Sequence, residues 1–115
     1  MDVVSDTPAS LEVDLATFAT AYESGEVVVL DVRNPDVYEA AHVPGAVLIP
    51  LGELPSRHEE VPDADPLYVI CAAGVRSLTA TKALVGAGHR ALSVAGGTHG
   101  WIARGGEVVA GDQPG

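Results

Sequence analysis

A chain of 115 residues that is 47% hydrophobic is long enough for one domain with its own core and too apolar to be disordered throughout. Its formal net charge of −10 repels phosphate backbones and anionic lipid surfaces, so nucleic acids and membranes are not expected as partners. The single cysteine and the lack of an apolar leader at the N-terminus predict a cytoplasmic protein.

Two polar segments flank the part of the chain that carries regular patterns. Residues 1–10 and 110–115 are polar or rich in Gly and Pro, and we expect both to be flexible ends. No repeat or linker divides the remainder, so we expect a single domain over residues 11–109.

The first half of this domain alternates apolar runs with helix signals. After a short strand at 11–13, Asp14 is expected to cap a helix whose apolar residues recur at helical spacing up to Ser24–Gly25. The continuous apolar run at 27–30 predicts a strand that is covered on both faces. Asn34–Pro35 then predicts the start of a turn or short helix, with Asn as the cap.

The second half repeats this alternation. In chain order we expect a turn at 43–45, a strand at 46–49, a short helix at 51–58, a strand at 67–70, a helix that ends at Gly88, a strand at 91–94 and a short helix at 99–104. Strands that alternate with helices predict an α/β fold with a mostly parallel sheet. In such sheets ligands bind beyond the carboxyl ends of the strands, which is where Asp31 and Cys71 stand.

Cys71 lies between an expected strand and the helix that follows it. Backbone N–H groups of a short glycine-containing loop and of a helix N-terminus converge on such a position and stabilise a thiolate. Arg76 can hold an anionic group or brace the loop against a carboxylate. This pattern indicates a reactive thiol, with a buried structural cysteine as the alternative. The candidate active-site loop consists of Cys71, Ala72, Ala73, Gly74, Val75, Arg76 and Ser77.

Four motifs in a fixed order identify a family resemblance. They are Val29–Arg33, Tyr38–Ala46, the loop from Cys71 to Arg76–Ser77, and Gly96–Trp101. On these motifs, which span most of the chain, the protein resembles the single-domain rhodaneses, a family of sulfurtransferases. The resemblance implies a single α/β domain with a mostly parallel five-stranded sheet flanked by helices.

The resemblance also implies a reaction. The Cys71 thiolate would take a sulfane sulfur from thiosulfate or a persulfide, and the resulting Cys71 persulfide would pass its outer sulfur to cyanide or a thiol. The partners are then small sulfur-containing donors and thiophilic acceptors, with a protein donor or acceptor as a further option. No metal and no organic cofactor are implied.

Some positions depart from the family pattern. Thiosulfate-preferring members carry cationic side chains directly after the cysteine, where this chain has Ala72 and Ala73. Together with the net charge of −10, this favours an uncharged persulfide or a protein persulfide as the donor. Val37 and Ala41 stand where relatives commonly show Glu and Gly, and we interpret Val37 as a local repacking with little consequence for the chemistry.

Asp31, Arg33 and His42 are candidate supporting residues. Asp31 would brace the cysteine loop, but an ion pair with Arg33 is the simpler interpretation. His42 would donate a proton near the loop, or would instead satisfy backbone groups in its turn. The other histidines share no metal-ligand spacing with Cys71, so no metal site is expected. Trp101 is expected to pack the last helix onto the sheet.

Other functions are open for the same loop. Phosphatases of the dual-specificity type and arsenate reductases use a loop one residue longer, which makes a wider cradle for a tetrahedral oxyanion than the loop from Cys71 to Arg76. A carrier module that relays a persulfide between proteins needs the same loop as an enzyme does. A redox sensor is the weakest alternative, because the chain has no second cysteine to resolve a sulfenic acid.

Overall fold

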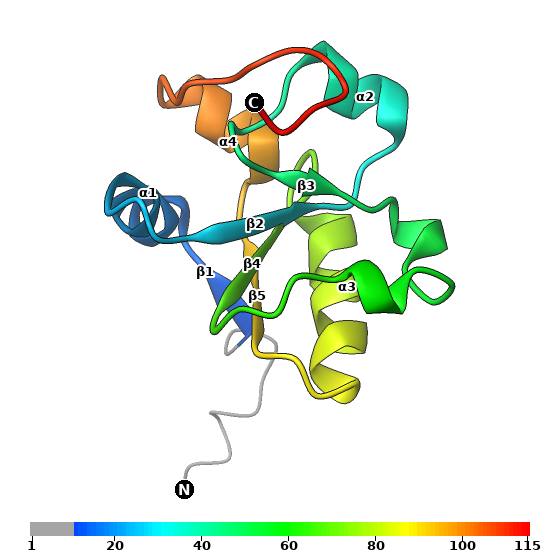
Figure 1. Cartoon of the computed structure of the whole chain (residues 1–115). Helices are drawn as coiled ribbons and strands as arrows, with labels where there is room; N and C mark the ends of the chain where they lie inside the picture. The colour runs from blue at the N-terminus through cyan, green and yellow to red at the C-terminus, as the bar shows by residue number, and fades with distance from the viewer. Residues whose placement is uncertain (1–10) are drawn as a thin grey trace, which may run out of the picture.

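The computed structural model describes residues 11–115, which form a five-stranded sheet in the order β1-β5-β4-β2-β3 (Figure 1). All four strand pairings are parallel. The strands are β1 at Glu12–Val13, β2 at Val28–Asp31, β3 at Val47–Leu48, β4 at Leu67–Ile70 and β5 at Ala91–Val94. The predicted α/β fold with its five-stranded parallel sheet is confirmed.

In the described part of the chain, four α-helices connect or follow the strands, namely α1 at Leu15–Glu23, α2 at Pro35–Ala40, α3 at Val75–Gly86 and α4 at Gly97–Ala103. Asp14 caps α1 as predicted, since its Oδ1 accepts the backbone N–H of Thr17 at 2.7 Å. Asn34 precedes α2, but its side chain makes no capping hydrogen bond. Among residues 11–115, no helix combines the length and apolar character that a membrane span requires.

The predicted single helix at 51–58 is wrong. The segment contains two 3₁₀ turns instead, at Leu51–Glu53 and His58–Glu60. Pro55 lies between them, and a proline within a helix removes one backbone hydrogen bond and clashes with the preceding turn. Leu54 is buried in the core, and Leu51 packs against the same cluster.

Helices cover both faces of the sheet (Figure 1). Leu67 and Val69 of β4 belong to the core cluster that includes Ala80 and Leu84 of α3. The alternating residues Tyr68 and Ile70 belong to the opposite cluster, which contains Phe18 of α1 and Trp101 of α4. Because successive side chains of a strand point to opposite faces, a strand covered on both faces reads as a continuous apolar run.

Trp101 lies in the core cluster that includes Tyr68 and Ile70 of the sheet, where it was expected, and it also packs α4 against α1. Its ring meets those of Phe18 and Tyr22 edge-on, at centroid distances of 5.4 and 5.1 Å. The indole N–H donates to the carbonyl oxygen of Glu107 at 2.7 Å. The ring is therefore both buried and hydrogen-bonded, which fixes the position of α4 beside the sheet.

The C-terminal segment runs back over the start of β3 and α2 (Figure 1). The N–H of Gly111 donates to Glu39, and the N–H of Gly45 donates to Pro114, each at 2.8 Å. The segment 110–115 thus makes hydrogen bonds to the residues around α2 and β3, and its flexibility stays a prediction. The other expected flexible end, residues 1–10, lies outside the described residues, and the domain limits remain a prediction.

Candidate functional site

Cys71 lies at the point where the chain reverses its direction across the sheet. β2 and β4 are neighbours, with Asp31 opposite Ile70 at their carboxyl ends. From β2 the chain proceeds outward to β3, and from β4 it proceeds to β5 on the other side. A crevice is expected between the loops that follow two neighbouring strands from which the chain leaves in opposite directions. This arrangement places the residues after Asp31 beside Cys71.

A cavity of about 440 Å³ opens at this point. It is lined by Arg33, Asn34, Val37, Cys71, Ala72, Ala73, Val75, Arg76 and His99. Cys71 is 2% exposed and so forms the floor, whereas Arg76 and His99 are exposed at the rim. Of the seven loop residues predicted from the sequence, five line the cavity, and Gly74 and Ser77 lie behind it, against the sulfur.

The sulfur of Cys71 is hydrogen-bonded to the backbone and side chain of its own loop. The N–H of Gly74 donates to Sγ at 3.1 Å, and Ser77 Oγ lies 3.3 Å from Sγ. Burial of the thiol raises its pKa, but the hydroxyl and N–H of Ser77 and the N–H groups of Gly74 and Ala73 outweigh this effect. The net result is a pKa of Cys71 below the usual value for a thiol. The group therefore ionises at a lower pH than a free cysteine.

The start of α4 holds the cysteine loop from behind. The N–H of Thr98 donates to the carbonyl oxygen of Cys71 at 2.7 Å, and the N–H of His99 donates to that of Ala72 at 2.9 Å. With these carbonyl oxygens turned toward α4, the N–H groups of the following residues are free to face the sulfur. The Gly96–Trp101 motif thus contributes to the site through backbone contacts.

Gly97 makes this close contact possible. A Cβ at this position would lie 2.5 Å from the carbonyl oxygen of Cys71 and 2.6 Å from that of Ala72, and the residue has φ +60°. We expect Gly97→Ala to lower the free energy of unfolding by about 3 kcal/mol or more, because overpacking adds to backbone strain. Urea unfolding measures this loss.

Gly25→Ala is the matched control for Gly97→Ala. Gly25 has φ +85°, but nothing lies within 4 Å of a Cβ built there, so it carries the strain without the clash. We expect it to cost about 1–2 kcal/mol. Equal losses for the two variants would show that the contact with the cysteine loop is not tight.

Asp31 and Arg33 form the predicted ion pair below the cavity wall. The Arg33 guanidinium donates from Nη2 to Oδ2 at 2.7 Å and from Nε to Oδ1 at 2.9 Å, and it also reaches the carbonyl oxygen of Ala41 at 2.9 Å. Asp31 is fully buried and Arg33 is 4% exposed. The carboxylate of Asp31 is thus occupied by Arg33, which itself lines the cavity.

His42 is buried away from the cavity. Its ring stacks on Tyr38 at 3.7 Å between centroids, Nδ1 lies 2.8 Å from the carbonyl oxygen of Tyr38, and Nε2 lies 2.9 Å from that of Gln113. Both ring nitrogens therefore face backbone carbonyl oxygens, and the interpretation as a residue that satisfies backbone groups matches this placement. The structure does not bring His42 to Cys71.

Some residues at the site were missed in the sequence. Val37 is 40% exposed and lines the cavity, so it forms part of the cavity wall, and its small consequence for the chemistry stays a prediction. Asn34 and His99 line the same cavity, and Ser93 of β5 contacts Ser77 at 2.8 Å. A serine within the apolar run of β5 is a detectable signal, since a polar residue in a buried strand needs a partner. Nothing in the sequence around Asn34 or His99 identifies either residue as part of the site.

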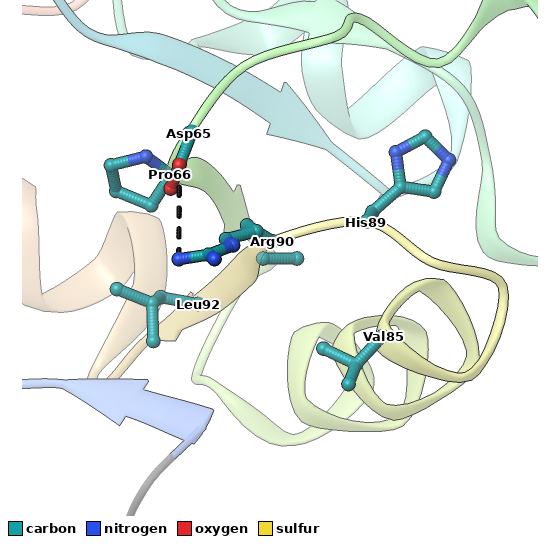
Figure 2. Close-up of a pocket in the computed structure, with 7 residues that line it drawn as sticks. Asp65, Pro66, Val85, His89, Arg90 and Leu92 are labelled. Carbon is teal, nitrogen blue, oxygen red and sulfur yellow. Dashed lines mark ion pairs between the residues drawn. The ribbon is translucent and has the colours of Figure 1, made fainter.

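A second pocket lies at the opposite end of the sheet (Figure 2). It encloses about 390 Å³ beside the residues that precede β4 and β5. Its walls are mainly apolar, and Arg90 and Asp65 face one another across it at 3.8 Å as a solvent-exposed pair. It lies at the amino ends of the strands and has no part in the cysteine site.

A profile of the rhodanese-like domain family matches residues 14–104, from the cap of α1 to the end of α4. The chain belongs to this family. The resemblance inferred from the four sequence motifs is confirmed.

Two relatives of this rhodanese-like domain bear sulfur-related names. The putative sulfur carrier protein YrkF of Bacillus subtilis is 37% identical over 95 residues, which cover 81% of this chain and 51% of YrkF. A sulfurtransferase of Allochromatium vinosum is 29% identical over 89 residues, which cover 76% of this chain and 83% of the relative. The chain thus spans about half the length of YrkF and most of the length of the sulfurtransferase.

Solved structures share the fold. The rhodanese-related protein of Thermoplasma volcanium superposes with a TM-score of 0.76 at 31% identity, and the match covers 85% of this chain and 96% of that one. The shared part includes nearly the whole of that solved chain.

Proposed function

We propose that this rhodanese-like domain transfers a sulfane sulfur through a persulfide on Cys71. The observation that carries the proposal is the thiol at the floor of an open cavity, with the N–H of Gly74 donating to its sulfur and the Ser77 hydroxyl oxygen 3.3 Å from it. Such donors stabilise negative charge on sulfur before and after the transfer, as an oxyanion hole does for oxygen.

The transfer balances in two displacement steps. The Cys71 thiolate attacks the outer sulfur of a persulfide or of thiosulfate, the S–S bond of the donor breaks, and a thiolate or sulfite leaves with its electron pair. The Cys71 persulfide anion remains in the cavity. An acceptor thiolate or cyanide then attacks the outer sulfur, and the Cys71 thiolate is released as the leaving group. Neither step requires a metal, an oxidant or a reductant.

The cavity favours an organic persulfide over thiosulfate as the donor. Its volume of about 440 Å³ is in the range of pockets that hold organic ligands, and thiosulfate is a small ion. Ala72, Ala73, Val37 and Val75 supply apolar wall around the sulfur. Arg76 is exposed at the rim and makes no ion pair with another described residue, so it is available to a carboxylate of the donor.

The test is intact-mass spectrometry after incubation with a donor. We expect the protein to gain one sulfur atom faster from a low-molecular-weight thiol persulfide than from thiosulfate, and cyanide to remove it. Ala73→Lys supplies the cationic neighbour that thiosulfate needs, so this variant is expected to load faster from thiosulfate. If neither donor leaves a cyanide-labile sulfur, the proposal fails.

The amount of thiocyanate released per protein separates an enzyme from a carrier. An enzyme forms many equivalents of thiocyanate per protein when small donor and cyanide are both present. A carrier loads one sulfur and discharges it slowly to small acceptors, and its exchange depends on a second protein. The names of the relatives include both a sulfurtransferase and a putative sulfur carrier.

A further inference from the structure

Three buried side chains, those of Ser93, Ser77 and Cys71, form a hydrogen-bond network that ends at the sulfur of Cys71. Ser77 Oγ lies 3.3 Å from Cys71 Sγ and 2.8 Å from Ser93 Oγ. Ser77 stands in the first turn of α3 and Ser93 on β5, and both residues are fully buried. A buried hydroxyl without a partner is costly, so the hydroxyl and thiol protons of this network are used for hydrogen bonds within it.

The direction of these hydrogen bonds depends on the charge of the sulfur. A hydroxyl has one proton to donate and accepts through its lone pairs. The neutral thiol donates its proton to Ser77 Oγ, and the hydroxyl proton of Ser77 then points to Ser93. A thiolate has no proton, so the Ser77 proton turns to the sulfur and Ser93 donates to Ser77 Oγ. The hydrogen bonds of this network therefore run in opposite directions in the thiol and thiolate states.

We propose that Ser93 is a positioning residue that stabilises the Cys71 thiolate through Ser77. Hydrogen bonds to an ionised acceptor are about twice as strong as neutral ones, and each bond in a chain polarises the next. Loss of the Ser93 hydroxyl therefore weakens the thiolate state more than the thiol state. The inference deepens the proposed function, and it rests on that function for the role of the thiolate.

The rate at which iodoacetamide alkylates Cys71, measured against pH, tests this role. Below the wild-type midpoint we expect Ser93→Ala to react roughly three- to ten-fold more slowly, and at high pH, where both proteins are ionised, to react at the wild-type rate. Thr81→Val is the matched control, because it removes a buried hydroxyl of α3 that has no partner among the described residues. Its profile is expected to coincide with that of the wild type.

Two further comparisons separate the hydroxyl from packing. Ser93→Thr keeps a hydroxyl and is expected to retain the wild-type profile. Ser93→Val has the same shape as the threonine variant but no hydroxyl, and it is expected to shift the profile to higher pH. In a Ser77→Ala background, Ser93→Ala is expected to have no further effect. An unchanged profile, a slower rate at every pH, or an equal shift with and without Ser77 would overturn the inference. Alkylation uses no sulfur donor, so this outcome is independent of whether sulfur transfer occurs.

Discussion

Cys71→Ser is expected to abolish sulfur loading from every donor. The hydroxyl of serine is not ionised near neutral pH and has no thiolate form, so no persulfide can be made at this position. Cys71 is the single cysteine of the chain, and no other thiol can replace it. We expect the rate of thiocyanate formation to fall roughly 10³-fold or more, to the rate without protein. The measurement is intact-mass spectrometry together with thiocyanate release.

The sulfur loading of the Cys71→Ser variant is informative if the variant is as fully folded as the wild type. Serine is slightly smaller than cysteine, and its hydroxyl can still accept the Gly74 N–H and contact Ser77, so we expect its urea unfolding to be close to that of the wild type. A folded variant that still gained a cyanide-labile sulfur would place the chemistry elsewhere in the protein. A variant that neither folds nor loads would be replaced by Cys71→Ala, which tests the same step.

Much of the site could be predicted because it is built from adjacent residues. The loop from Cys71 to Ser77 follows a recognisable apolar strand and begins a helix, so its N–H groups converge on the sulfur for reasons that are local in sequence. The Asp31–Arg33 pair spans two residues and was likewise accessible from the sequence. Strand and helix positions followed from periodicity for the same reason.

The parts that were missed depend on contacts between distant segments. His42 meets Gln113 across 71 positions, and that contact joins the C-terminal segment to the residues after α2. Composition alone marks a Gly- and Pro-containing end as flexible, since it cannot show which backbone groups will be hydrogen-bonded. Val37 and His99 reach the cavity because the topology brings the loop after β2 and the start of α4 beside Cys71. Such neighbours become visible once the strand order is known.

Asp31→Asn is expected to destabilise the fold by about 3–5 kcal/mol. Asp31 is fully buried and its carboxylate accepts from Nε and Nη2 of Arg33, so neutralising it leaves the guanidinium charge buried without its counter-ion. The free energy of unfolding in urea measures the loss. Arg57→Gln serves as the control, because the pairs of Arg57 with Glu53 and Glu60 are exposed and are expected to contribute little.

The double variant Asp31→Asn/Arg33→Met identifies the cause of this loss. If the cost of Asp31→Asn arises from an unpaired buried charge, removing that charge as well should recover part of the stability, because an apolar chain of similar length can replace a buried ion pair. If the cost arises from lost packing, the two changes should add. Arg33 also lines the cavity, so sulfur loading by the double variant tests whether the pair acts on Cys71 through the cavity wall. Recovered stability with slower loading is the expected combination, and fully additive losses would contradict the role assigned to the charge.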